Sequence, residues 1–164
     1  MKRFLVLVMV FACGLVCMPV RAISENQKSA IVDNCDSIKN SLKQVQKDDA
    51  RVRIALGGRY ETILTNFITP FNVRLVENGL SNADLVENQN EFSNSKITFN
   101  NDYIKYQQEL ENLIALDCKN SPDDFYDKLE KVRQKRKIME QDTLKIRSLL
   151  TVHMSLATKI RSEV

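Results

Sequence analysis

Residues 31–56 read IVDNCDSIKNSLKQVQKDDARVRIAL, and apolar side chains recur in them at alternating steps of four and three residues. This spacing places the apolar side chains along one side of an α-helix, as in the seam of a coiled coil. The stretch therefore predicts a long amphipathic helix that packs against other helices. Its seam positions are Ile31, Cys35, Ile38, Leu42, Val45, Asp49, Val52 and Leu56, of which only Asp49 is charged.

The same spacing returns in two later stretches of the chain, 85–113 and 125–160. The first of them carries the aromatic residues Phe99, Tyr103 and Tyr106 at helical intervals. We interpret these rings as core packing, because aromatic side chains on the apolar side of a helix bury large areas. Three amphipathic helices can bury their apolar sides on one another, whereas two would leave one side in water.

Two polar segments mark where the later helices are expected to begin. Ser121-Pro122-Asp123-Asp124 offers a serine N-cap, a proline at the first helical position and two acids that complement the helix dipole. Ser81, three residues before Asp84, is expected to cap the preceding helix in the same way.

Residues that make turns are scarce after residue 22. Gly57, Gly58 and Gly79 are the only glycines there, and Pro70 and Pro122 are the only prolines. A sheet protein of this size needs many more turn residues. The composition therefore predicts an all-α fold.

Cys35 and Cys118 are the two cysteines that remain after residue 22, and their positions favour one topology. The midpoint between them falls on Glu77-Asn78-Gly79, a turn sequence, so a helical hairpin folded there brings both sulfurs to the same level. A disulfide needs Cα atoms within about 7 Å of each other. The alternative is a reversal at Gly57-Gly58, which would add a separate helix over 59–71. It would leave the two cysteines tens of ångströms apart, at about 1.5 Å per residue.

We therefore expect an elongated three-helix antiparallel coiled-coil bundle with one disulfide between Cys35 and Cys118. The three helices are expected over roughly 25–77, 82–118 and 122–161. The first of them is expected to be kinked near Gly57-Gly58 and at Pro70.

The first 22 residues have the layout of a secretory signal peptide. Lys2 and Arg3 are followed by FLVLVMVFACGLVC, an uncharged apolar run over residues 4–17. Val20-Arg21-Ala22 then supplies modest or small residues at the −3 and −1 positions of a cleavage site.

An uncleaved N-terminal anchor is the alternative for the same segment. Residues 4–20 approach the roughly 18–20 apolar residues that can span a bilayer. Gly14 and Pro19 weaken such a helix, so we favour cleavage. We accordingly expect a signal peptide over 1–22 and a single helical domain over 23–164, with membrane contact only through the N-terminal segment.

Export changes the charge of the working protein. The whole chain carries a formal net charge of +3, and all of that excess comes from Lys2, Arg3 and Arg21. Residues 23–164 hold 21 basic and 21 acidic side chains. Because general nucleic-acid binding needs a clustered excess of positive charge, we expect no nucleic-acid partner.

The sequence offers little catalytic chemistry. His153 is the only histidine; neither an HExxH nor a CxxCH motif occurs, and no glycine-rich phosphate loop follows residue 22. His153 falls on a seam position, so we interpret it as a packed interior histidine rather than a metal ligand. We therefore predict no catalytic, cofactor-binding or metal-binding residue and no enzymatic activity.

Two charged residues, Asp49 and Arg136, occupy seam positions where apolar residues are expected. One interpretation is a wide surface groove, or side chains that reach water past the edge of the bundle. The other is a polar layer that fixes the register of the helices. Their levels in the expected bundle do not match well, but the two residues could just meet, so a pair between them is one alternative. The basic run over 131–137 is interpreted as a solvated helix face, with an anionic-surface site as the alternative.

The composite pattern resembles uncharacterised small exported coiled-coil proteins of candidate-phylum bacteria (Saccharibacteria-like, Patescibacteria). The resemblance implies export from a bacterial cell and carries over no functional residue beyond the cysteine pair. The residues that carry it are Cys35, Asp49, Arg53, Leu56-Gly57, Tyr60, Pro70-Phe71-Asn72, Arg74-Leu75, Asp117-Cys118, Pro122, Phe125-Tyr126, Leu129 and Val132-Arg133.

From these observations we expect a non-enzymatic exported helical bundle that acts as a structural or protein-interaction module at the bacterial cell envelope, with an unknown protein partner. The alternative is a periplasm-type helical chaperone or carrier of apolar clients. Exposed apolar surface distinguishes the two, because a chaperone must present it to its clients.

Overall fold

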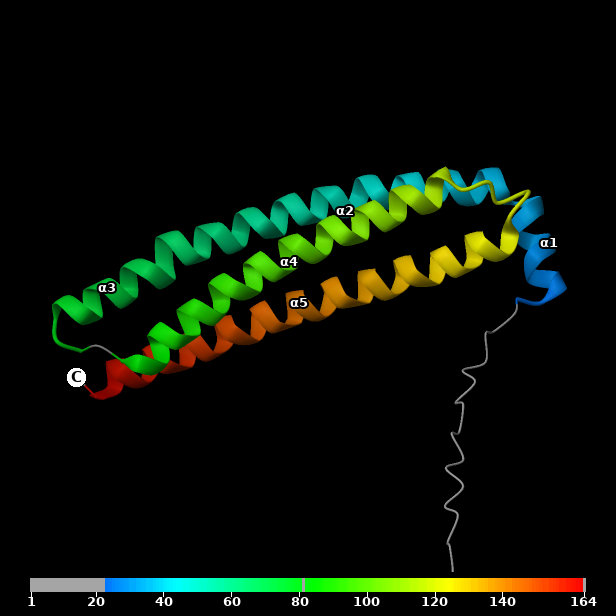
Figure 1. Ribbon diagram of the computed structural model, residues 1–164. Helices are drawn as coiled ribbons and strands as arrows, with labels where there is room; N and C mark the ends of the chain where they lie inside the picture. Colours follow the sequence, from blue (N-terminus) through cyan, green and yellow to red (C-terminus); the bar gives the residue numbers. More distant parts are fainter. Residues whose placement is uncertain (1–22, 81, 164) are drawn as a thin grey trace, which may run out of the picture.

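The computed structural model describes residues 23–80 and 82–163, and their regular structure is helical with no strand (Figure 1). The all-α prediction is confirmed for this part of the chain. The expected signal peptide over 1–22 and the expected cap Ser81 lie outside the described residues. The elements are α1 (Glu25–Asp33), α2 (Cys35–Ile63), the π-helix η1 (Leu64–Ile68), α3 (Thr69–Glu77), α4 (Ala83–Ala115) and α5 (Pro122–Glu163).

Three long helical rods lie side by side and give the molecule an elongated shape (Figure 1). The first rod is α2, η1 and α3 in direct succession; α4 and α5 are the other two. Residue numbers rise along α2 and α3 while they fall along α4, so these two rods run antiparallel. The contacts that show this are Gln46–Glu111, Asp49–Tyr106 and Asn72–Leu85.

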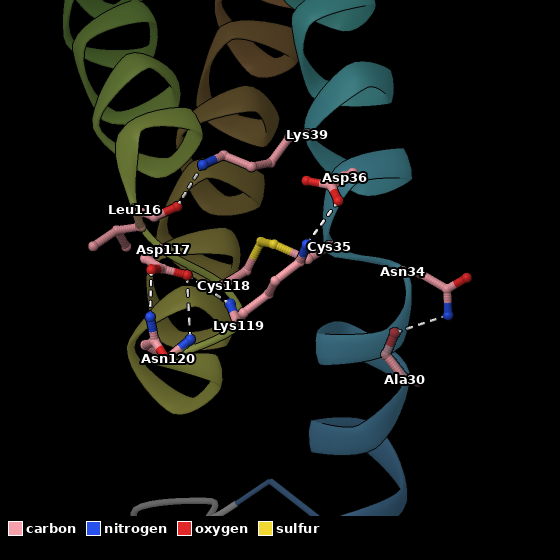
Figure 2. The surroundings of a disulfide bond; sticks show 10 residues. All are labelled: Ala30, Asn34, Cys35, Asp36, Lys39, Leu116, Asp117, Cys118, Lys119 and Asn120. Atoms are coloured by element: carbon pink, nitrogen blue, oxygen red, sulfur yellow. Dashed lines mark hydrogen bonds and ion pairs between the residues drawn. A yellow bond between two sulfur atoms is a disulfide. The ribbon is translucent and has the colours of Figure 1, made fainter.

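The expected first helix over 25–77 is interrupted at Asn34, so a separate short helix, α1, precedes the three long rods and the predicted count of three helices is not confirmed. Asn34 has φ −107° and ψ 12°, and its side-chain Nδ2 donates to the Ala30 carbonyl at 2.9 Å (Figure 2). Asparagine competes in this way for backbone groups and ends helices. α1 consequently leaves the line of α2 and leans on α5, where Lys28 pairs with Asp123 at 3.0 Å.

The chain does not reverse at Gly57-Gly58. α2 runs through both glycines as an α-helix, and the irregularity lies further on, in the π-helical turn η1. The Thr69 N–H bonds to the Leu64 carbonyl five residues back, immediately before Pro70. Proline has no N–H and crowds the preceding turn, and a wider π turn relieves that crowding.

The predicted turn at Asn78-Gly79 is confirmed. Gly79 has φ +70°, a left-handed conformation that suits glycine. The Leu80 N–H bonds to the Leu75 carbonyl and the Gly79 N–H to the Val76 carbonyl, which together make a Schellman C-cap.

α4 begins directly after this turn. The Asn82 side chain accepts hydrogen bonds from the N–H groups of Asp84 and Leu85, so the N-cap of the helix is Asn82 and not the expected Ser81.

The two cysteines lie at disulfide distance at one end of the bundle, with Cα atoms 5.7 Å apart (Figure 2). Cys35 opens α2, Cys118 lies in the turn between α4 and α5, and both are buried. Lys39 donates to the Leu116 carbonyl at 2.8 Å, which adds a second link between α2 and this turn.

The core consists of two apolar clusters, one toward each end of the rods. The cluster near the disulfide includes Ile31, Cys35, Tyr106, Leu113, Phe125 and Val132. The cluster toward the Asn78-Gly79 turn consists of Tyr60, Ile68, Phe92, Phe99, Ile146 and Leu149. Phe99, Tyr103 and Tyr106 are all buried, so the prediction that they pack in the core is confirmed.

Replacing both Cys35 and Cys118 by serine is expected to lower the free energy of unfolding by about 2–4 kcal/mol, because the bond closes a long loop in the unfolded chain. Urea denaturation followed by circular dichroism measures the loss. Reduction of the unmodified protein should give the same loss, and a loss below about 1 kcal/mol in both experiments would contradict the expected contribution of the bond.

Candidate binding groove

The seam of α2 opens at Val52, whose side chain is 54% exposed although it occupies a predicted core position. Here a groove of about 570 Å³ separates α2 from α5, between the two apolar clusters. Side chains from three helices line it: Asp49, Val52, Arg53 and Leu56 from α2, Phe99 from α4, and Arg133, Arg136, Lys137, Met139, Glu140 and Thr143 from α5.

The groove has an apolar floor and a charged rim. Phe99 of α4 is fully packed beneath it, and Leu56 and Met139 are partly buried on either side. The rim carries four basic groups against two acidic ones, so the lining has an excess of two positive charges. An apolar occupant with negative charge fits this lining.

Asp49 and Arg136 meet, although the sequence left this pair only as an alternative. Arg136 Nη2 donates to Asp49 Oδ1 at 2.9 Å, and the Tyr106 hydroxyl donates to Asp49 Oδ2 at 2.5 Å. The Asp49 side chain is only 13% exposed, whereas that of Arg136 is 57% exposed. Both interpretations of the charged seam positions therefore hold in part: a polar layer joins all three rods, and it borders a surface groove.

Tyr106 is held as a hydrogen-bond donor in this layer. Burial, and secondly its hydrogen bond to the Asp49 carboxylate, raises the pKa of the Tyr106 hydroxyl well above its usual value. The phenol therefore stays protonated at physiological pH and satisfies one oxygen of Asp49. With Arg136 on the other oxygen, the carboxylate is engaged at both of its atoms.

Arg53 holds a fixed position at the edge of the groove. Its guanidinium carbon lies 5.4 Å from the centroid of the Tyr103 ring, a cation–π contact. Its Nε is buried and has no hydrogen-bond partner among the residues that the structure describes. Part of the basic rim is thus pre-positioned by packing.

The basic run over 131–137 divides between groove and solvent. Arg133, Arg136 and Lys137 line the groove, whereas Lys131 and Lys135 do not. Arg133 also pairs with Glu130 on its own helix. The sequence predicted a solvated face for the whole run, and the structure turns three of its five cations toward a concave surface.

His153 is buried on α5, as the sequence predicted, and its ring lies edge-on to Phe71 of α3 at 5.9 Å between centroids. Burial lowers the pKa of this imidazole. In residues 23–80 and 82–163 no group of three His, Cys, Asp or Glu side chains could hold a metal ion. Over the same residues, no helix is both long and apolar enough to cross a bilayer.

A buried amide network at the turn end of the bundle was not expected from the sequence. Asn72 Nδ2 donates to the Leu85 carbonyl and to Gln89 Oε1, and Asn88 Nδ2 donates to the Leu149 carbonyl at 3.1 Å. The spacing of the residues could have indicated that Asn88 is buried, because it lies three residues after Leu85 and four before Phe92, on the same side of the helix.

Comparisons with protein-family models, curated proteins and solved structures found no match to this chain. The groove is therefore interpreted from its own geometry and charge.

The substitution Asp49→Leu is expected to lower the free energy of unfolding by about 1–3 kcal/mol, because it leaves the buried Tyr106 hydroxyl without a partner. Chemical denaturation measures the change. Asp48→Leu on the exposed side of the same helix turn is the matched control, and it should stay within about 0.5 kcal/mol of the original. Adding Tyr106→Phe to Asp49→Leu should recover part of the loss; strictly additive effects would show that the two groups are not coupled.

Lowering the pH through about 6.5 is expected to destabilise the protein through His153. Because burial lowers the pKa of His153 in the folded state from its ordinary value of 6.5, the unfolded chain takes up the proton first. The free energy of unfolding therefore falls as the pH drops from about 6.5 to the folded-state pKa. Thermal melts of His153→Leu should lack this component above about pH 5, where carboxylates remain ionised. An unchanged pH dependence in the variant would contradict the assignment.

Proposed function

We propose that this chain is a non-enzymatic exported helical bundle that binds a protein partner in the groove between α2 and α5. In this proposal the three long rods act as one antiparallel three-helix coiled-coil bundle at the bacterial cell envelope, with residues 23–164 as the working domain. The observation that carries the proposal is the groove itself. It is an apolar floor with a basic rim, left open between two packed clusters on a disulfide-linked scaffold.

Several features support the exported location. Stable disulfides are typical of oxidising compartments outside the cytoplasm. The first 22 residues have the composition of a signal peptide. Directly after the expected cleavage site, Ile23 is buried and Ser24 forms a capping box with Gln27.

The chemistry of the groove supports binding rather than catalysis. Of its two carboxylates, the partly buried Asp49 is occupied at both oxygens by Tyr106 and Arg136, and Glu140 lies exposed on the rim. Arginine side chains stay protonated in proteins and do not act as bases at physiological pH. The lining therefore offers shape, apolar surface and fixed charge.

The alternative, a chaperone or carrier of apolar clients, is favoured by the exposed apolar side chains at the groove, such as Val52. The two functions differ in specificity. A chaperone suppresses the aggregation of unrelated clients, whereas an interaction module recognises one partner.

A photo-crosslinking residue placed at Val52 is expected to give a discrete set of adducts in native envelope preparations. The same residue at Ile104, an exposed apolar position on α4 outside the groove, is the matched control and should give none. An excess of the chain carrying Val52→Glu should not compete the adducts away, because the introduced charge opposes docking of the partner. Adducts of equal yield at both positions would contradict a specific groove, and suppression of client aggregation would favour the chaperone.

A further inference from the structure

We infer that the partner segment is an amphipathic helix with acidic side chains at the end that lies against Arg133 and Lys137. This inference rests on the proposed function and adds the class of partner. The occupant would lie along the open side of α2 and α5 as a further helix of the bundle, a mode of recognition in which an apolar helix face enters a groove.

The apolar edge of the groove is longer than the groove itself. Phe67 is 65% exposed and lies one turn before Phe71, which contacts His153 of α5, so Phe67 faces the same side as the groove. Met154 is 70% exposed and follows Arg136 by 18 residues, which is five helical turns, and so lies on the same side of α5. From Val52 to Phe67 the edge extends about 22 Å along the rod.

The walls of the groove run parallel to each other. Asp49 meets Arg136, and further along Phe71 meets His153, so residue numbers rise together in α2–α3 and α5. Two parallel helices with an apolar strip between them present the ridges and hollows that a third helix fills. About 15 residues of helix match the length of the edge.

An acyl chain fits this site less well than a helix does. Small-molecule pockets enclose most of their ligand's surface. Here the edge residues Val52, Phe67 and Met154 are more than half exposed, so a lipid tail would remain largely in water. An amphipathic helix meets the apolar strip with one face and keeps its polar face in solvent.

The groove itself carries most of the basic groups of the site, and Arg147 adds one exposed cation between Arg136 and Met154 on α5. Arg133, Arg136 and Lys137 lie beside Asp49, whereas the other end of the edge carries Phe67 and Met154. Arg136 is bound to Asp49 and Arg133 also pairs with Glu130 on its own helix, but Arg133 and Lys137 are both exposed on the rim. Acidic side chains in the partner helix would therefore gather at that end.

The test uses the purified disulfide-bonded chain and two labelled helical peptides of about 15 residues. Both carry one leucine stripe; one has glutamates at one end and the other has lysines there. Fluorescence anisotropy should show binding of the glutamate peptide, weaker at higher salt, and little binding of the lysine peptide. The double variant Arg133→Glu with Lys137→Glu should weaken binding at least about tenfold.

Lys131→Glu with Lys135→Glu is the matched control, since it makes the same charge change on the same helix outside the groove. It should leave the affinity of the glutamate peptide nearly unchanged, and thermal melts check that both double variants fold. If the two double variants weaken binding of the glutamate peptide equally, the effect is one of net charge alone and the inference is overturned.

Three other outcomes also overturn the inference, and they separate it from the proposed function. Equal binding of the two peptides removes the charge preference but keeps the groove. Binding of anionic phospholipid vesicles without peptide binding assigns the site to lipid. If sedimentation shows that the chain self-associates and Val52→Glu abolishes the association, the occupant of the groove is a second copy of the chain. If no peptide binds while crosslinks at Val52 persist, the partner is not a helix; if the crosslinks also fail, the proposed function fails with it.

Discussion

The covalent link between Cys35 and Cys118 sets the register on which the rest of the bundle depends. It ties the first residue of α2 to the turn between α4 and α5. From that point the helical rise determines which side chains meet: Asp49 lies 14 residues beyond Cys35, and Tyr106 lies 12 residues before Cys118. A shift of one residue would turn each seam by about 100° and separate the polar layer.

The two apolar clusters and the polar layer stabilise different parts of the bundle. The clusters hold the rods together toward their ends, and the polar layer joins them beside the groove through Asp49. Burying a carboxylate costs free energy that its partners must offset, so such a layer contributes more to register than to stability. The groove is therefore held in shape from both sides by packing that does not involve its occupant.

The sequence predicted the helical class, the cysteine pair and the Asn78-Gly79 turn, because each follows from helical spacing and chain length, and it left a pair between Asp49 and Arg136 as one alternative. It did not predict the break at Asn34, since one asparagine in a helical pattern is common and its capping bond depends on local geometry. It offered a surface groove at Asp49 and Arg136 only as one of two interpretations, and it did not predict the size or the lining of the groove. Spacing tells which side of a helix faces its neighbours, but not how far away they lie, and Val52 is on the seam yet exposed.

The π turn at Leu64–Ile68 has a consequence for the phase of the helix. Beyond Tyr60 the inward positions are Leu64, Ile68 and Asn72, in steps of four, which is longer than the α-helical repeat. An uninterrupted α-helix would rotate these side chains progressively away from α4. The wider turn takes up the excess, much as an inserted residue is absorbed in a coiled coil. Beyond Tyr60 the spacing of the inward residues thus changes to steps of four, and the first rod still presents one continuous inner surface to α4.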